Sequence, residues 1–248
     1  MHDRTRFLGP SLLLVAILLS LPQAGWAVQI TYELAVRSPH VWRGITLREF
    51  PVLNASATVV THNGFAAQLW LGIDLEDDNG RQGEIQEIDL DLSYTWDTEH
   101  QSITLGFVEL FFPGGIDETG ELYAKWQSKR PLRPRFEIFY NVDLLQDTFA
   151  LFSLSHPWRP SEPWAPTLTA SVAYAGADYA RFFGGSRAGL HHWSLQLDFD
   201  LAVRHYDAKF RLAYSQSLDD QVLPDQPARL WGGLYLSLSR SWERRRPR

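Results

Sequence analysis

Two neighbouring runs of alternating residues constrain this chain more than any other feature. The stretch from Ile88 to Phe112 reads IDLDLSYTW, then DTEHQ, then SITLGFVELFF. A period of two indicates β-strands with one apolar and one polar face, and the five polar residues between the runs predict a long hairpin. Long strands that carry carboxylates on one face and aromatic residues near their ends are typical of a membrane barrel wall. A soluble sandwich also alternates, but it buries its apolar face against a second sheet.

The same pattern continues through most of the chain and predicts an all-β fold. About twelve segments of roughly ten residues alternate in this way between residue 28 and the C-terminus. The links between them tend to alternate in length: longer links follow the odd strands, and shorter turns such as HNG and DTEHQ follow the even ones. Outer-membrane barrels have this arrangement, with an even strand number. We therefore expect a single closed antiparallel transmembrane β-barrel of about 12 strands over residues 28–248, with both termini on the short-turn side.

Two links depart from this rule and leave the strand count open. The link near Gln146 is short where a long one is expected, and the proline-rich stretch HPWRPSEPWAP is long where a short one is expected. The stretch GADYARFFGGSRAGLHH is the longest that we expect to be irregular. Many barrels end on an aromatic residue. Here Trp242 is followed by a basic tail, ERRRPR, so the chain departs from that pattern.

The first residues form a pattern that predicts a secretory signal peptide. Arg4 and Arg6 precede a short apolar run, and small residues follow at Gly25 and Ala27. A charged start, a short apolar core and a small-residue site are the three parts of a cleaved leader. We expect cleavage after Ala27. An uncleaved anchor helix is the alternative, and Pro10 together with the short apolar run argues against it.

Composition excludes several classes of function. The chain has no cysteine, so a disulfide framework or a thiolate metal site is excluded. The net charge of -6 gives no basic footprint for nucleic acid. Aromatic residues make up 13% of the chain. Many of them fall near predicted strand ends, and we expect them in interfacial girdles rather than in an ordinary aromatic core. At the short-turn end these are Tyr94, Trp96, Trp126, Phe136, Trp158 and Trp164; at the other end they are Trp193 and Trp231.

The strand registers place charged residues on the face opposite the apolar rows. If the apolar rows face lipid, these charges line the lumen, where they set a bias toward cations. The alternative is that acids and bases pair across a narrow lumen and close it, since twelve strands fall between small filled barrels and open porins. The expected pore-lining residues are Glu33, Arg37, Glu87, Asp89, Asp91, Lys125, Glu137, Asp143, Asp198, Asp200, Lys209 and Arg211.

The segment HVWRGITL, His40 to Leu47, carries two further candidates. Arg43 is expected either to act as an eyelet charge or to hold the loop by hydrogen bonds, and Trp42 is expected to pack beneath that loop. This segment resembles the opening motif of the TorF-like porin family. HNGFAAQLWLG, EIDLDLSY and FFPGG followed by GELYAKW resemble later motifs of that family in the same order, and the resemblance covers residues 28 to 145. The resemblance implies an outer-membrane β-barrel porin and supplies no catalytic residue.

Metal or catalytic sites have weak candidates. His191 and His192 are adjacent, so on a regular strand they point to opposite faces and cannot share one metal ion. The acidic loop LEDDNGRQGE departs from the EF-hand pattern and is expected to be solvated. Ser155 and His156 are the candidate pair for an outer-membrane hydrolase, without a visible third partner. We therefore expect no cofactor, no metal and no enzymatic activity.

The sequence thus predicts a bacterial outer-membrane porin that lets small polar or ionic solutes diffuse through a charged lumen. Its expected partners are outer-membrane lipids and those solutes. Three alternatives remain open: a plugged structural or binding barrel whose external loops meet a partner, an outer-membrane enzyme, and a soluble periplasmic β-protein.

Overall fold

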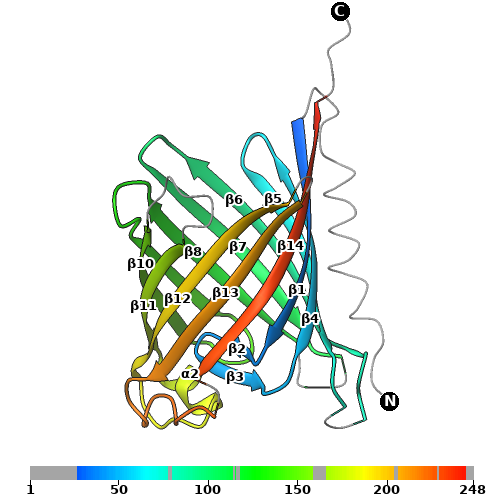
Figure 1. Ribbon diagram of the computed structural model, residues 1–248. Helices are drawn as coiled ribbons and strands as arrows, with labels where there is room; N and C mark the ends of the chain where they lie inside the picture. The colour runs from blue at the N-terminus through cyan, green and yellow to red at the C-terminus, as the bar shows by residue number, and fades with distance from the viewer. Residues whose placement is uncertain are drawn as a thin grey trace, which may run out of the picture.

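The computed structural model is a closed barrel of twelve antiparallel strands (Figure 1). It describes residues 27–77, 80–113, 115, 118–158, 166–203, 206–227 and 229–243. The expected signal peptide, except Ala27, and Trp164 lie outside the described residues. Each strand of the ring pairs with the next ring strand along the chain, and the ring closes where β1 pairs with β14. The predicted fold class is therefore confirmed.

The strands of the ring run from β1 to β14, and two further strands, β2 and β3, form a separate hairpin. The ring is composed of β1 (Ala27–Ser38), β4 (Val52–Thr61), β5 (Phe65–Asp74), β6 (Ile85–Asp97), β7 (Gln101–Phe111), β8 (Thr119–Ser128), β9 (Arg135–Asn141), β10 (Thr148–Pro157), β11 (Pro166–Ala175), β12 (Gly189–Val203), β13 (Tyr206–Ser217) and β14 (Leu230–Glu243). The hairpin is β2 (His40–Trp42) and β3 (Ile45–Arg48), and the described helix is α2 (Ala177–Phe182).

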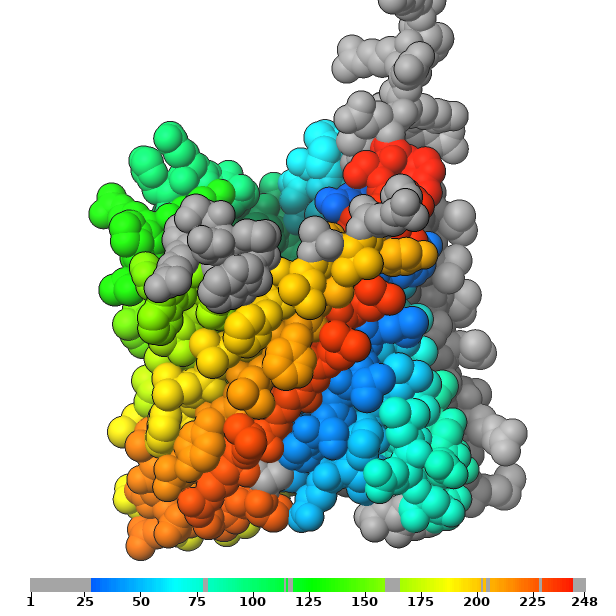
Figure 2. Space-filling model, in the orientation of Figure 1, coloured from blue at the N-terminus to red at the C-terminus, as the bar shows by residue number. Residues whose placement is uncertain are grey.

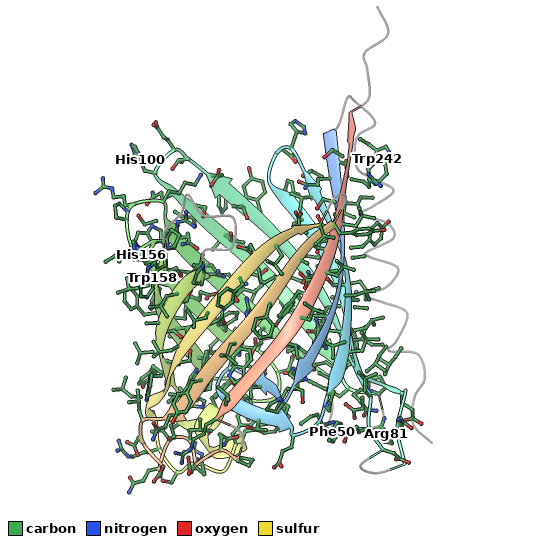
Figure 3. All side chains as sticks on the ribbon, viewed as in Figure 1. Phe50, Arg81, His100, His156, Trp158 and Trp242 are labelled. Atoms are coloured by element: carbon green, nitrogen blue, oxygen red, sulfur yellow. The ribbon has the colours of Figure 1, made fainter. Side chains whose placement is uncertain are left out.

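The two ends of the barrel differ in the length of their links. Phe50 and Arg81 lie at the end where the links are longer, here called the long-link end (Figure 3). His100, Trp158 and Trp242 lie toward the opposite, short-turn end (Figure 3). The two links that broke the length rule do not change the strand count, because β9, β10 and β11 pair in sequence order.

Closure follows from the register of the first and last strands. The pairing of β1 with β14 extends from Ala27–Glu243 to Ser38–Gly232 in a continuous register. Figure 2 shows the tilted strands packed side by side, with β14 directly against β1. A sheet sealed in this way has no edge, so its backbone N–H and C=O groups are paired within the wall. Among the described residues, no helix is long and apolar enough to cross a membrane.

The outer surface is apolar, as the alternation predicts. Leu34 of β1 is 53% exposed and Leu234 of β14 is 57% exposed, and similar residues follow around the ring. At the short-turn end, Phe65, Tyr94 and Trp96 form two edge-to-face ring pairs with centroids 4.6 and 4.5 Å apart. Trp158 is 58% exposed. Isolated apolar side chains are common on soluble proteins, but a continuous apolar band around a closed barrel matches a lipid-facing surface.

Two predictions about the links and ends were wrong. Trp231 belongs to no girdle, because its indole Nε1 donates a hydrogen bond to Ser215 Oγ, 3.0 Å away, on the inside of the barrel. The stretch 176–192, expected to be irregular, contains α2 and the beginning of β12. That helix forms because the Asp147 carboxylate accepts hydrogen bonds from the backbone N–H groups of Asp178 and Tyr179 in its first turn.

An arginine placed on the outer face should destabilise the barrel much more than one placed next to it on the inner face. Leu236 points outward near the middle of β14, and we expect Leu236→Arg to cost about 2–4 kcal/mol, because its charge faces lipid. Ser237→Arg is the matched control: its side chain faces Glu33 across the β1–β14 register. Urea unfolding in lipid vesicles measures both free energies, and equal losses would contradict a lipid-facing exterior.

Candidate functional site in the lumen

The β2–β3 hairpin lies at the long-link end of the barrel (Figure 1). Val41 pairs with Thr46 and Trp42 with Ile45, so Arg43 and Gly44 form a two-residue turn. Both have positive φ, 49° and 78°, as the tight hairpin turns that match strand twist require. A Cβ at Gly44 would lie 2.5 Å from Cγ of His192 on β12. After β1 the chain therefore forms a hairpin that reaches across to the far wall. Glycine is needed at position 44 for that close approach.

Arg43 fixes the hairpin tip to the wall. Its guanidinium makes a bidentate pair with the Glu121 carboxylate of β8, with N–O distances of 2.6 and 3.0 Å. Three aromatic rings surround the same guanidinium within 4.9 Å of its central carbon, those of Trp42, Phe139 and Phe149. Charge-assisted bidentate bonds and cation–π contacts strengthen each other when water is excluded. We call the Arg43–Glu121 ion pair the latch.

An apolar cluster holds the hairpin from the long-link end. Ile45 packs in a buried group of residues from β10, β11, α2 and the 218–229 link. Trp42 packs against the rings of Tyr179 and Phe183, with centroids 6.5 and 6.3 Å apart. Trp42 and Arg43, which were predicted to anchor this loop, make these contacts with the loop folded into the barrel. The buried members of the cluster are Ile45, Phe149, Ala173, Ala175, Tyr179, Ala180, Val222 and Leu223.

The hairpin separates two cavities. A cavity of about 340 Å³ lies toward the long-link end and is lined by His40, Trp42 and Arg48 of the hairpin. A second cavity of about 460 Å³ is lined by Val41, Arg43 and Gly44, and it extends to the β8–β9 turn at the short-turn end. Of the residues that the structure describes, none lines both cavities. The latch lies between the two cavities, with Glu121 bordering the first and Arg43 the second.

Charged residues follow the inner face of the strands, mostly where the register predicted them. Three ion pairs lie along one part of the wall: Arg135 with Glu137 at 2.8 Å, Arg211 with Asp198 at 2.7 Å, and Lys209 with Asp200 at 3.7 Å. Lys125 instead sits over the ring of Tyr123, 4.1 Å from its centroid. Acids and bases therefore pair within the wall, between neighbouring residues of the sheet.

The β6 row has fewer basic partners. Glu87, Asp89 and Asp91 share one face of the strand at alternate positions. Asp91 accepts hydrogen bonds from Tyr123 Oη at 2.8 and 2.7 Å. Asp89 Oδ1 is buried without a hydrogen-bond partner. No described lysine or arginine lies within 4.0 Å of any of these three carboxylates, so none of them forms an ion pair.

Arg37 and Glu33 both belong to β1, and Arg37 is held by side-chain hydrogen bonds. Arg37 donates to Asn54 Oδ1 at 2.5 Å and to His40 Nε2 at 3.0 Å. Glu33 pairs in register with Ser56 and Ser237. Asp143 differs from its prediction: β9 ends at Asn141, so Asp143 lies in the link to β10. The strand stops there because the Asn141 side chain bonds to Thr119 Oγ1 and accepts from the Leu145 N–H, which turns the chain.

The expectation that His191 and His192 point to opposite faces was wrong. The register shifts between Val172 and Tyr174, so both histidines lie opposite Ala173 in a bulge. Both rings are buried, and their Nδ1 atoms are 2.9 Å apart. The described residues contain no group of three or more potential metal ligands. Arg43 and the aromatic rings of Phe149 and Tyr179 surround this pair.

Ser155 and His156 do not form a catalytic pair. Ser155 Oγ bonds to Thr169 Oγ1 at 2.9 Å and lines the second cavity. His156 is the next residue on a regular strand and is exposed on the opposite face. A serine and its base must be within hydrogen-bonding distance, and the sheet itself separates these two side chains.

Comparison with known proteins supports the fold. No protein-family model matches the chain, and no curated protein matches it. Among solved structures, it is similar to the KdgM porin, with a TM-score of 0.53, 8% identity, and coverage of 85% of this chain and 98% of that one. KdgM in complex with disordered oligogalacturonate gives a TM-score of 0.52 at 8% identity, covering 85% and 98%. The NanC porin gives 0.50 at 11% identity, covering 84% and 98%. The chain has the barrel fold of these porins.

Removing the negative charge from the latch should release the hairpin. Glu121→Gln leaves the buried Arg43 guanidinium without its counter-charge, which typically costs about 3–5 kcal/mol. We expect amide hydrogen exchange in β2 and β3 to become much faster, while the wall strands keep their protection. The double variant Arg43→Met with Glu121→Met removes both charges and should retain more protection. Wild-type exchange rates in Glu121→Gln would show that the latch does not hold the hairpin.

Acid should also weaken hairpin docking. Burial, together with the positive charges of Arg37 and Arg48, lowers the pKa of His40 to about 3. In a released hairpin the pKa of His40 returns to its ordinary value, roughly 6.5. The released state therefore binds the extra proton between these values, so docking is strongest above pH 6.5 and weakens as the pH falls toward 3.

The measurement is hydrogen exchange in β2 and β3 across that pH range, corrected for intrinsic exchange rates. His40→Gln is the matched control, because its amide oxygen still accepts from Arg37 but does not titrate. We expect its docking to depend less on pH than that of the wild type. The same pH profile in both proteins would exclude His40 as the source.

Proposed function

We propose that the protein is a bacterial outer-membrane porin through which small polar or ionic solutes diffuse. The observation that carries this proposal is the combination of a sealed barrel, an apolar exterior and an interior lined by charged and hydroxyl side chains around two cavities. In lipid, such a barrel satisfies its backbone internally and encloses the polar groups in a hydrated path. This function requires no bond chemistry, and we propose no enzymatic activity.

The orientation and family follow from the sequence. With residues 1–27 as a cleaved leader, the mature chain of 28–248 begins in the periplasm, and the long-link end is the external one. We propose membership of the TorF-like porin family from the ordered motifs in residues 28 to 145. The KdgM and NanC porins share the fold, and their likeness supports a solute pathway without identifying the solute.

Selectivity for cations is the expected consequence of the inner surface. Arg135, Lys209 and Arg211 have carboxylate partners on the wall, whereas the β6 row retains negative charge without close basic partners. Fixed charge of one sign in a narrow, low-dielectric passage attracts counter-ions and repels ions of like charge. We propose that the three carboxylates of the β6 row act together in this field. The remaining predicted lining residues, including Glu33, modulate this field.

One observation favours a second candidate function. We propose that the latched hairpin closes the lumen in this conformation, since it lies between the two cavities. If the hairpin never leaves this position, the protein is a plugged barrel whose long links meet an external partner. The porin and the plugged barrel are distinguished by whether the hairpin can be released while the wall stays folded.

Conductance in planar lipid bilayers tests the proposal. We expect small currents for the wild type and larger currents for Glu121→Gln, because a weakened latch opens the divided lumen. Asp89→Asn should lower the permeability ratio of K⁺ to Cl⁻ because it removes charge from the β6 row. Asp97→Asn is the matched control, since it removes one carboxylate from the exposed short-turn end.

Folding must be verified in each sample by heat-modifiable migration in a detergent gel. The absence of current in both the wild type and Glu121→Gln, with the barrel folded, would reject passive diffusion and favour the plugged barrel. Unchanged ion selectivity in Asp89→Asn would reject the role of the β6 row while leaving diffusion intact.

A further inference from the structure

Trp231 occupies a position that neither lipid contact nor core packing explains. Its ring lines the second cavity, and its Nε1 is fixed by Ser215 Oγ. No aromatic ring of the described residues pairs with it, unlike the rings in the cluster around Tyr179. An indole whose polar atom is already satisfied and whose carbon face borders a polar lumen is suited to contact an amphipathic solute.

A fixed polar network lies on the wall next to this indole. The Arg211 guanidinium donates to both Asp198 oxygens, at 2.7 and 3.1 Å. Gln196 Nε2 donates to Asp198 Oδ2 at 2.8 Å. All three side chains line the same cavity as Trp231. Arg211 has five N–H donors and uses two of them here, so donors remain beside acceptors that are already oriented.

Hydroxyl groups continue this polar surface across neighbouring strands. Ser194 pairs in register with Ser171 on one side and Ser215 on the other. Ser171 and Ser194 bond through their Oγ atoms at 2.6 Å, and either can donate. Each hydroxyl has one donor and two acceptor positions, so such pairs can exchange partners with a hydroxylated solute at little cost.

The charges around this surface are neutralised within the wall. Arg211 is paired with Asp198, and Arg135 with Glu137. Arg133 also lines the cavity, but it is exposed in the turn between β8 and β9 and does not belong to the β12–β14 wall. The guanidinium beside Trp231 already has a carboxylate counter-charge, so a carboxylated solute would gain no unpaired charge there. A neutral polyhydroxylated solute would find the remaining donors, oriented acceptors and an apolar face.

We propose that the β12–β14 wall of the second cavity is a binding site for a neutral saccharide. The C–H face of a pyranose ring contacts the indole of Trp231, and its hydroxyls bond to Ser194, Gln196 and the Asp198–Arg211 pair. The cavity of about 460 Å³ has the size of ordinary small-molecule sites, which span roughly 300–1,000 Å³. The inference deepens the proposed porin function by naming a solute class, but binding at this site does not depend on passage through the latch.

Saturation-transfer-difference NMR on the folded, detergent-solubilised barrel tests the proposal. The probes are methyl glucoside, sodium galacturonate and glycerol, each titrated separately. We expect transfer to the ring protons of methyl glucoside, weaker transfer to galacturonate and none to glycerol, which has no ring face. Trp231→Ala should weaken methyl glucoside binding roughly tenfold, the loss of one aromatic contact.

Trp193→Ala is the matched control, because Trp193 is the adjacent tryptophan of β12 whose ring pairs with Tyr214 and lines neither cavity. It should bind methyl glucoside as the wild type does. Gln196→Ala tests the polar side of the site independently of the indole, and it should weaken binding several-fold.

The outcomes separate this inference from the porin proposal. Equal binding by Trp231→Ala and wild type, or stronger binding of galacturonate than of methyl glucoside, would overturn the neutral-saccharide site. No binding of methyl glucoside by a folded wild-type barrel would do the same. Neither result depends on bilayer conductance, so a barrel that conducts ions but binds no saccharide would retain the porin proposal and lose this one.

Discussion

The pairing of every wall strand with two neighbours is the constraint on which the structure depends. Because β14 returns to β1, an apolar environment can surround the whole sheet without meeting an unpaired backbone edge. Alternation then divides the side chains into two populations: apolar ones such as Leu34 face outward, and polar ones such as Glu33 face inward. The closed ladder thus creates the lumen and also determines which residues can line it.

The interior of the barrel is enclosed by the wall, so it supports charged contacts that a solvent-exposed surface would weaken. The Arg43–Glu121 pair joins residues 78 positions apart, away from bulk solvent and among aromatic rings. Such a pair depends on its complete surroundings, because a buried charge without its partner is costly. The hairpin is consequently docked by a small number of specific contacts, in contrast to the wall, which is held by many equivalent backbone hydrogen bonds.

The wall could be predicted from sequence, because its signal is local. The alternation that predicted about twelve strands is local to each segment, and β4 and β5 are two of the strands that it indicates. The hairpin inside the lumen could not be predicted in this way, because its partners Glu121, Phe149 and Tyr179 are remote in sequence and nothing in HVWRGITL specifies them. Helix α2 was missed for a similar reason: Asp147, which caps it, belongs to another link.

The error at Trp231 had a local signal that could have corrected it. Leu230, Leu234 and Leu236 occupy one parity of β14 and face outward, so Trp231 shares the other parity with Tyr235 and Ser237. An aromatic residue near a strand end suggested a girdle, but parity decides the face. The misplacement of Asp143 had no such local signal, because the end of β9 depends on the bond between Asn141 and Thr119.

The bulge in β12 has a consequence for how this barrel tolerates changes in length. Two residues, His191 and His192, lie opposite Ala173, while Leu190 and Trp193 keep their pairings on either side. Loss of one histidine would restore a simple two-residue repeat without inverting the flanking side chains. The pairing of β14 with β1 has no register shift. Losing one interior residue of β14 would therefore move the lumen-facing side chains of part of the strand to the outer face, and the outer ones to the lumen. The β12 wall can therefore lose one residue over evolutionary time without inverting its neighbours, whereas the β1–β14 seam cannot.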